Sequence, residues 1–264
     1  MRVNRSESAE PANDERRYRA PALEKGLDIL ELLASHGQAM TPSQIAARLD
    51  RSMSELFRMI QVLEYKGYIT LAQSGDGYEL SNRLFTLGMA RAPTRTLLEA
   101  AMPVMRELAE TVRQSCHLAV ASDEQMVVVA RIENPGQFGF SVRPGYRRGL
   151  TEATSGLVLY AFQPPEVRER WLGVLKAAKI GAKALSAFQT RTEQVRSRGY
   201  AAEPSDFVQG ITDLSAPVMA GAAAVAALTV PYVQAVPPPR TLEQTVEDLR
   251  AAARRISTDL AAVQ

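Results

Sequence analysis

The chain has 264 residues and a mass of 28.8 kDa, enough for two domains at roughly 150 residues each. Hydrophobic residues make up 46% and charged residues 23%, a globular composition that excludes wholesale disorder and collagen-like repeats. One cysteine and two histidines exclude an internal disulfide and leave little material for a metal site or a catalytic triad. Because 31 basic and 29 acidic residues give a net charge of only +2, function has to be sought in local patterns.

The first twenty residues are polar, mixed in charge and without an apolar core, so they do not have the pattern of a signal peptide. We expect residues 1–20 to be a disordered tail. An additional DNA-contacting arm that uses Arg16, Arg17 and Arg19 is the alternative.

Residues 214–236 carry no charge and are numerous enough to span a bilayer. The segment is nevertheless rich in alanine and contains two prolines and Gly221. We therefore interpret it as two strands, 213–220 and 224–233, around a glycine turn. No membrane partner is expected, and the chain is predicted to be cytoplasmic.

Residues 21–80 are predicted to form a small helical domain. Apolar residues at helical spacing indicate a first helix that ends near Gly37. The runs Thr41–Gln44 and Ser52–Glu55 are capping boxes, each of which opens a further helix. Only residues 50–52 separate these two helices, and such a corner is typical of a helix-turn-helix.

Two strand-like runs, 68–71 and 77–80, follow the second capped helix and predict a winged helix. In such a domain the second helix of the pair enters the major groove of DNA, and the hairpin lies on the phosphate backbone. Glu55 could accept a hydrogen bond from a cytosine, although capping alone explains this residue equally well. The candidate DNA-contacting residues are Arg48, Arg51, Ser52, Met53, Ser54, Glu55 and Arg58.

The charge of this domain indicates an alternative function. Residues 22–80 carry five basic and eight acidic side chains, a net charge of −3. A winged helix used only for protein contacts is therefore the alternative. DNA binding would depend on locally placed arginines, helix N-termini and the avidity of a dimer.

Several short runs of the chain resemble, in the same order, the IclR family of bacterial transcription regulators. They are Ala22–Leu30 (ALEKGLDIL), Ile45-Ala46, Arg58, Gly67–Ile69, Tyr78–Leu80, Leu84–Gly88, Ala153–Gly156, Arg198–Ala201 and Ser215–Val218. The resemblance implies a homodimer or a dimer of dimers that binds double-stranded operator DNA and a small-molecule effector. The chain departs from the family at Ser52–Glu55, where a Pro-Lys-Ser-Thr run is common, so the operator sequence of relatives does not apply to it.

Together these observations predict an α+β protein. An N-terminal winged helix-turn-helix domain (21–80) is joined by a linker helix region (81–102) to a GAF-like, antiparallel-sheet effector-binding domain (103–264). Within the linker region we expect one helix to end before Pro93, and Pro103 to open a new helix. The resemblance implies that the linker pairs two winged helices, and a rigid spacer is the alternative.

The second domain is predicted to be an antiparallel sheet with helices to one side. A capping box at Thr241 opens a long last helix, which we expect to cover the sheet, with a dimer contact as the alternative. The other helices are expected at 156–162, 166–177 and 186–198, and the strands at 116–121, 125–132, 138–142 and around residues 213 and 228.

A sensor domain needs a concave apolar site with a few placed polar groups. The run Thr154-Ser155-Gly156 opens a helix whose free N–H groups attract carboxylates, and the resemblance implies that this corner binds organic acids. Alignment with the family adds further polar positions. An aromatic residue could form an apolar wall of the site, and an arginine could bind a carboxylate with two hydrogen bonds. The candidate effector-binding residues are Thr154, Ser155, Glu203, Asp213, Thr229, Phe140 and Arg148. For Thr154 and Ser155 the alternative role is helix capping. For Phe140 it is packing in the core, and for Arg148 it is exposure to solvent.

Asp213 departs from the family, in which a small or apolar residue is common at this position. A carboxylate there would repel a dianion and would suit a ligand with hydroxyl donors. We therefore expect a carboxylic acid effector, either a hydroxylated aromatic acid or a sugar acid.

Catalytic chemistry has little support in this sequence. The glycine-rich segments lack phosphate-loop and dinucleotide spacings. Cys116 and His117 are neighbours on a predicted strand, so their side chains point to opposite faces and do not form a nucleophile–base pair. We expect a buried thiol beside a histidine that faces the pocket or an interface, and neither a cofactor, a metal nor an enzyme activity.

The predicted function is that of a ligand-responsive transcription regulator that controls a catabolic operon. Two alternatives stay open. One is an architectural DNA-binding protein without ligand control, and the other is an enzyme or carrier domain with a winged-helix interaction module.

Overall fold

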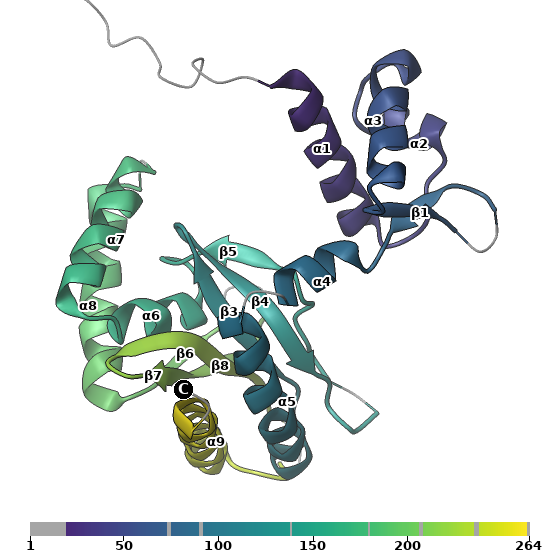
Figure 1. The fold of residues 1–264 in the computed structure, drawn as a ribbon. Helices are drawn as coiled ribbons and strands as arrows, with labels where there is room; N and C mark the ends of the chain where they lie inside the picture. The colour runs from purple at the N-terminus through teal and green to yellow at the C-terminus, as the bar shows by residue number, and fades with distance from the viewer. Residues whose placement is uncertain are drawn as a thin grey trace, which may run out of the picture. The chain divides into compact units, whose positions relative to one another are not determined.

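The structure is a computed structural model that describes residues 20–72, 75–89, 92–137, 139–178, 180–205, 208–234 and 238–262. The chain divides into two compact units, one that ends at residue 91 and one that begins at residue 92. This division falls inside the predicted linker region. Figure 1 shows the helices and strands of both units. Residues 1–19, with the arginines of the expected tail, lie outside the described residues.

The first unit contains the predicted winged helix. Its elements are α1 (Pro21–His36), α2 (Pro42–Arg48), α3 (Met53–Tyr65), β1 (Ile69–Leu71), β2 (Tyr78–Leu80) and α4 (Arg83–Met89). Thr41 caps α2 as predicted, because its Oγ1 accepts from the Gln44 N–H at 3.3 Å and its own N–H donates to Gln44 Oε1 at 2.8 Å. Asp50 adopts a left-handed φ of 51° and turns the chain between α2 and α3.

The predicted hairpin is confirmed, and its base is attached to the loop before α2. Strands β1 and β2 pair antiparallel, and Tyr78 also exchanges two backbone hydrogen bonds with Met40, at 2.8 and 2.9 Å. Gly77 permits this close approach: its φ is +104°, and a Cβ at this position would lie 2.6 Å from the Met40 carbonyl carbon. The wing is therefore held against the helical part of the unit.

The second unit is built on one six-stranded antiparallel sheet, in the order β5-β4-β3-β8-β7-β6. The strands are β3 (Cys116–Ser122), β4 (Gln125–Ile132), β5 (Arg147–Gly149), β6 (Ala201–Pro204), β7 (Ile211–Ala220) and β8 (Ala223–Val233). The helices are α5 (Ala92–Val112), α6 (Thr154–Ala161), α7 (Pro165–Ala177), α8 (Ala182–Arg198) and α9 (Leu242–Ala262). The uncharged stretch forms β7 and β8 as predicted, and none of the described helices is long and apolar enough to cross a membrane.

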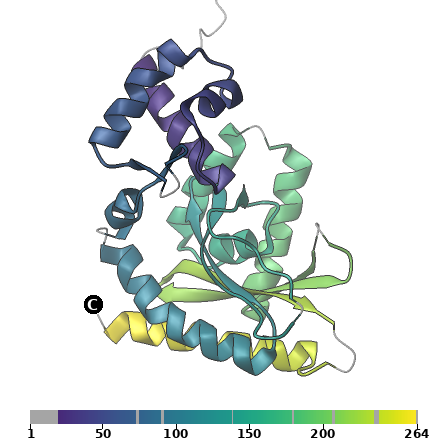
Figure 2. The same ribbon diagram turned by 90° about the vertical axis from the view of Figure 1, so that its right-hand side faces the viewer.

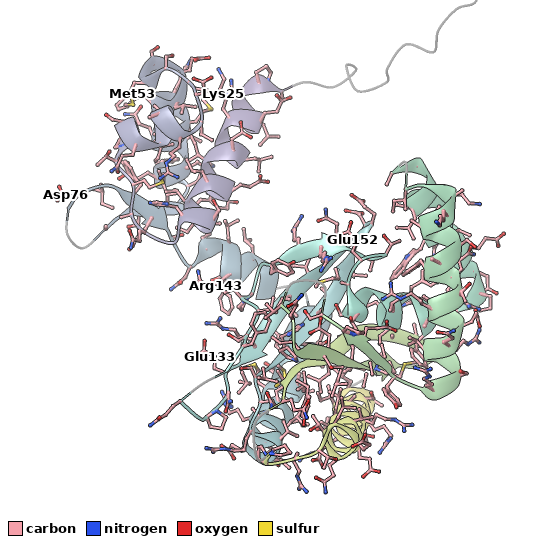
Figure 3. The ribbon with its side chains drawn as sticks, turned by 180° about the vertical axis from the view of Figure 1, so that it is seen from behind. Lys25, Met53, Asp76, Glu133, Arg143 and Glu152 are labelled. Carbon is pink, nitrogen blue, oxygen red and sulfur yellow. The ribbon has the colours of Figure 1, made fainter. Side chains whose placement is uncertain are left out.

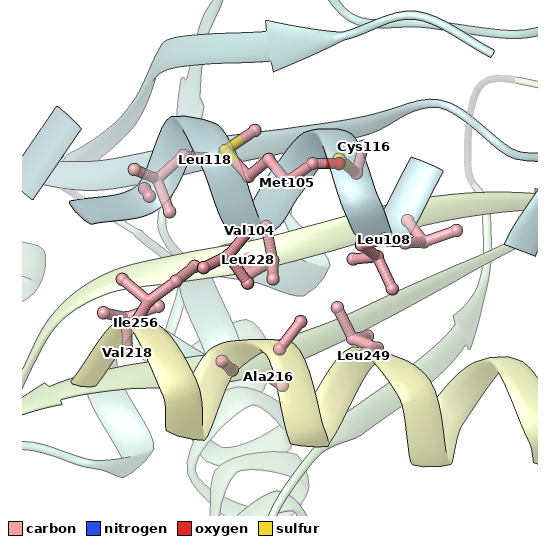
Figure 4. Close-up of a cluster of buried hydrophobic side chains, with 14 of the residues drawn as sticks. Val104, Met105, Leu108, Cys116, Leu118, Ala216, Val218, Leu228, Leu249 and Ile256 are labelled. Atoms are coloured by element: carbon pink, nitrogen blue, oxygen red, sulfur yellow. The ribbon is translucent and has the colours of Figure 1, made fainter. Parts of the chain in front are cut away.

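Helices cover both faces of this sheet, so the expectation of helices to one side is wrong. On one face α5 and α9 lie side by side (Figure 2) and pack on Leu118 and Leu228 (Figure 4). On the other face α6 and α8 pack on Ala119 and Ala227. The physical reason is that consecutive residues of β3 and β8 are apolar, and a strand that is apolar on both faces has to be covered twice. Helix α9 covers the sheet as predicted.

Helix α5 continues through Pro103, so the prediction that this proline opens a new helix is wrong. The proline removes the hydrogen bond to the carbonyl of Glu99, a residue that is exposed to solvent. Leu97, Ala101 and Met105 are buried in one stripe that extends past the proline on both sides. Packing of this stripe against the sheet keeps α5 a single helix. The second half of the predicted linker therefore belongs to the second unit.

The expected strand over 138–142 is also absent from its described residues, 139–142. The chain turns at Gly145 (φ +85°) and forms β5 instead, in which Arg148 lies opposite Met126 of β4. The alternation of apolar and polar residues resembled a strand, but backbone pairing with β4 begins only at this turn, where Gly145 and Tyr146 exchange hydrogen bonds with Val128 at 2.8 and 2.9 Å. The short edge strand β6 was not predicted, because four residues that end in a proline carry little strand signal.

Candidate functional site

The polar side chains of the first turn of α3 bind one another. The Glu55 carboxylate accepts hydrogen bonds from the N–H and the hydroxyl of Ser52, at 3.2 and 3.0 Å, and Ser52 Oγ lies 3.1 Å from Ser54 Oγ. The other carboxylate oxygen of Glu55 accepts a hydrogen bond from Lys25 Nζ of α1 at 3.0 Å. Figure 3 labels Lys25 on α1 and Met53 at the start of α3.

These contacts favour capping over base reading for Glu55. The Lys25 ammonium, followed by the Ser52 N–H and hydroxyl, lowers the pKa of the Glu55 carboxyl from 4.5 to about 2. Both of its oxygens already have partners, so a cytosine amino group would have to displace one of them. Sequence reasoning missed Lys25, because no local pattern indicates that α1 brings a cation to this corner.

The three candidate arginines differ in their surroundings. Arg51 Nη2 lies 3.6 Å from Asp28 Oδ2, and both side chains are partly exposed. Arg48 and Arg58 are exposed and form no ion pair within the described part of the chain. These two guanidinium groups are therefore available to phosphates or bases.

Apolar side chains accompany Arg58 on α3. Met53, Ser54, Phe57 and Arg58 line an open hollow on the surface of this helix. The exposed fractions of Met53 and Phe57 are 36% and 51%. Phe57 was not among the candidate residues, because an apolar side chain beyond the first turn of a helix carries no sequence signal for DNA contact.

A second site is a cavity on the sheet face that carries α6. It has an empty volume of about 520 Å³, part of which is open to solvent. Of the candidate effector-binding residues, Phe140, Arg148, Thr154, Ser155, Asp213 and Thr229 line it, and Glu203 does not. The lining also includes residues that were not candidates: His117, Met126, Val142, Tyr146, Glu152, Ala153, Arg191, Pro204 and Ser205.

Helix α6 begins at this cavity. Thr154 and Ser155 are buried in its first turn, where backbone N–H groups have no acceptor within the helix. Gly156 is required here, because a Cβ would overlap the carbonyl oxygen of Leu150. The tight approach of α6 to Leu150 therefore fixes the direction in which its N-terminus faces the cavity.

A row of buried polar side chains crosses the cavity floor. His117 of β3 lies opposite Thr229 of β8, which in turn lies opposite Ser215 of β7. The two hydroxyls are 2.9 Å apart. His117 is only 4% exposed, and its Nδ1 has no hydrogen-bond partner among the described residues. Ser205 Oγ at the same cavity also has none among them.

Burial determines the charge state of the histidine. It lowers the pKa of His117 from 6.5 to about 4, so the imidazole is neutral near pH 7. The neighbouring Cys116 lies in the cluster on the opposite sheet face, where burial raises the pKa of its thiol to about 12. The predicted separation of these two side chains is confirmed, and the histidine faces the cavity.

Charged side chains at the cavity occur in pairs of opposite sign. Arg148 Nε lies 3.2 Å from Glu152 Oε2. Arg191 Nη2 lies 3.4 Å from Glu203 Oε2, and Glu203 is the register partner of Asp213. Glu203 is therefore adjacent to the cavity but directed to Arg191. Asp213 adds a further carboxylate to the cavity lining, so these groups leave no excess of positive charge, which suits an effector with one carboxylate better than one with two.

The first unit is a winged helix with exposed arginines, and the antiparallel sheet of the second unit carries a cavity with polar side chains on its floor. This is the organisation of a DNA-binding transcription regulator. Residues 22–71 match the IclR helix-turn-helix domain, and residues 90–258 match the bacterial transcriptional regulator IclR C-terminal domain. The chain belongs to the IclR family of bacterial transcriptional regulators.

Individual relatives are distant but similar over most of their length. The HTH-type transcriptional regulator KdgR of Escherichia coli K12 is 24% identical over 222 residues, which are 83% of this chain and 84% of KdgR. An IclR homolog from Microbacterium hydrocarbonoxydans, complexed with 4-hydroxybenzoate, is 26% identical with a TM-score of 0.76, over 91% of this chain and 99% of that chain. Pseudomonas aeruginosa HmgR is 28% identical with a TM-score of 0.71, over 90% and 98%.

Proposed function

We propose that this regulator binds a hydroxylated aromatic acid in the cavity of the second unit and thereby changes the affinity of its winged helix for a DNA operator that controls a catabolic operon. The observation that carries the proposal is the buried Nδ1 of His117 on the cavity floor, which has no hydrogen-bond partner among the described residues. A buried polar atom without a hydrogen bond costs about 1–3 kcal/mol, and a bound hydroxyl group would supply the missing partner.

The carboxylate of the effector would lie at the start of α6. The N–H groups of the first turn and the hydroxyls of Thr154 and Ser155 attract an anion there. Phe140, Val142 and Met126 supply the apolar wall that an aromatic ring needs. This wall favours an aromatic acid over a sugar acid, and the similarity to the Microbacterium protein complexed with 4-hydroxybenzoate supports the same choice.

On the DNA side, α3 would enter the major groove, and Arg48, Arg51 and Arg58 would contact phosphates or bases. The chain would act as a homodimer or a dimer of dimers. Helix α4 supports this proposal, because Leu84, Phe85 and Leu87 are 39%, 66% and 50% exposed, an apolar surface suited to a second copy. A regulatory rather than an enzymatic role agrees with the inert thiol of Cys116.

Isothermal titration of the full-length protein with 4-hydroxybenzoate, benzoate, gluconate and succinate tests the effector class. We expect 4-hydroxybenzoate to bind about tenfold more tightly than benzoate, because one additional hydrogen bond is made. His117→Leu should reduce this preference, whereas Asp259→Asn on the exposed side of α9 should not. Tight binding of succinate that Asp213→Ala leaves unchanged would contradict the proposal.

A further inference from the structure

The polar groups at the start of α3 have few hydrogen bonds left to offer to DNA. The carboxylate of Glu55 is bound by Ser52 and Lys25, and the hydroxyl of Ser52 is bound by Glu55 and lies next to that of Ser54. The exposed residues that lie next to these groups on α3 are of a different kind. They are Met53, Phe57 and Arg58, which line one hollow together with Ser54.

Met53 and Phe57 are one helical turn apart, so their side chains are neighbours on the surface of α3. Leu56 and Ile60 of the same helix are fully buried in the core of the first unit, whereas the exposed fractions of Met53 and Phe57 are 36% and 51%. The core therefore has no need of this apolar pair. Two exposed apolar side chains that are neighbours in one hollow form a patch, and exposed apolar patches mark binding surfaces.

We infer that Met53 and Phe57 read the operator through the C5-methyl groups of thymine, while Arg58 in the same hollow binds an adjacent guanine or phosphate. The inference rests on the proposed DNA-binding function of α3 and adds the kind of base that this helix selects. Thymine is the base that presents a methyl group in the major groove, and apolar side chains recognise it by contact.

DNA is the occupant that the surroundings of the pair favour. The hollow is continuous with the exposed guanidinium of Arg58 and lies at the N-terminal end of the second helix of a helix-turn-helix. Positive charge and free helix N–H groups at this end attract phosphates. The net charge of −3 on residues 22–80 also means that attraction to the backbone is weak, so contacts to base edges have to contribute more of the affinity.

The direct test replaces thymine by uracil, which removes the methyl group and leaves every hydrogen-bonding atom in place. A tight-binding duplex is first selected from a random pool with the full-length protein. Each thymine is then replaced by uracil, one position at a time, and the Kd is measured by fluorescence anisotropy. Uracil at one or two positions in a half-site should weaken binding about fourfold each, as expected for one buried methyl-sized group.

Variants identify the side chain that reads each methyl. Phe57→Ala should weaken binding to the thymine duplex and abolish the difference between thymine and uracil at one position, and Met53→Ala should do so at another. Tyr65→Ala is the matched control, because Tyr65 is an 85% exposed aromatic residue at the other end of the same helix. It should leave the discrimination against uracil unchanged.

Equal affinity of the wild-type protein for every uracil duplex would overturn the inference without affecting the proposed function, and this measurement needs no variant. Retained discrimination in both alanine variants would also overturn it. If sedimentation shows that these variants change the oligomeric state and uracil has no effect, the pair covers a second copy instead. If selection yields no preferred sequence, the proposed function fails together with the inference.

Discussion

The start of α3 and the floor of the cavity differ in how their polar side chains are satisfied. At the start of α3, the Glu55 carboxylate accepts hydrogen bonds from Ser52 and from Lys25 of α1 at 3.0–3.2 Å, and the apolar Phe57 nearby is half exposed. In the cavity the apolar side chains pack around buried polar ones, and His117 Nδ1 lacks a partner among the described residues.

The difference follows from solvent. For exposed polar groups, a hydrogen bond to a neighbouring side chain and one to water differ little in free energy. A buried polar atom has no such alternative, and leaving it unpaired costs about 1–3 kcal/mol. The first site is therefore ready to bind through apolar contacts and arginines, whereas the second is incomplete until a polar ligand enters.

The largest effect is expected at the helix that orients the cavity. Gly156→Ala should destabilise the second unit by about 2–3 kcal/mol, because the new Cβ would overlap the Leu150 carbonyl oxygen. Urea unfolding followed by the fluorescence of Trp171, the single tryptophan, reports on this unit. Gly173→Ala in α7, where a Cβ has nothing within 4 Å, should instead stabilise it by about 0.5–1 kcal/mol. Equal effects of the two variants would show that α6 is not tightly fixed.

On the DNA side, Arg58→Ala should weaken operator binding by about 1–3 kcal/mol. If Arg58 binds a guanine, the loss should be confined to sequences that carry this base pair. If it binds a phosphate, the loss should be similar for all sequences. Anisotropy with the selected duplex and its single-base variants distinguishes the two. Lys66→Ala, at the other end of α3, is the control, and an equal effect of that variant would contradict a specific role of Arg58.

The cavity should make the stability of the second unit depend on pH. The folded-state pKa of His117 is about 4 against an ordinary value of 6.5, so between these values the unfolded chain binds a proton that the folded chain does not. The free energy of unfolding should therefore fall by about 1.4 kcal/mol for each unit by which the pH is lowered below 6.5. Trp171-monitored unfolding between pH 6.5 and 5 measures this slope.

His117→Leu isolates the contribution of this imidazole. The variant should remove most of the slope and leave the second unit at least as stable as the wild type at pH 7, because it removes a buried nitrogen that has no hydrogen-bond partner among the described residues. The same variant should bind 4-hydroxybenzoate more weakly. His36→Asn in α1 should change neither quantity. An unchanged slope in His117→Leu would mean that other groups dominate the titration.

The smallest effect is expected at Glu55. Because its oxygens already bind Ser52 and Lys25, Glu55→Gln should leave the base preferences of the protein unchanged. Repeating the selection from the random pool with this variant is the measurement. A lost preference at a C·G pair would show that Glu55 reads a base and does not merely cap α3.

The local signals predicted the first unit well. Capping boxes depend on residues three apart, so the starts of α2 and α3 could be read from Thr41 and Ser52 without knowledge of the fold. Strands β3 and β4 were predicted to within one residue at each end, because their apolar runs are bounded by turns. Pro103 was misjudged, because burial of Leu97 and Met105 against distant segments decides whether α5 continues.

The cavity could be predicted only in part. Thr154, Asp213 and Thr229 were candidates through family resemblance, and the fold brings them together from α6, β7 and β8. Arg191 was not a candidate, because the position of α8 over the sheet is not encoded in any short pattern. Phe57 was overlooked because amphipathic spacing identifies residues that face the core, not which exposed residues face a partner.

If an acid in the cavity changes the affinity of the winged helix for DNA, one titration will show it. The Kd for the selected duplex is measured by anisotropy with and without saturating 4-hydroxybenzoate, for the wild type and for His117→Leu. We expect the Kd of the wild type for DNA to change by about 5- to 150-fold, the range of a typical allosteric coupling, and that of the variant to change much less at the same ligand concentration. An acid that binds the wild type but leaves its Kd for DNA unchanged would show that the cavity does not control DNA binding.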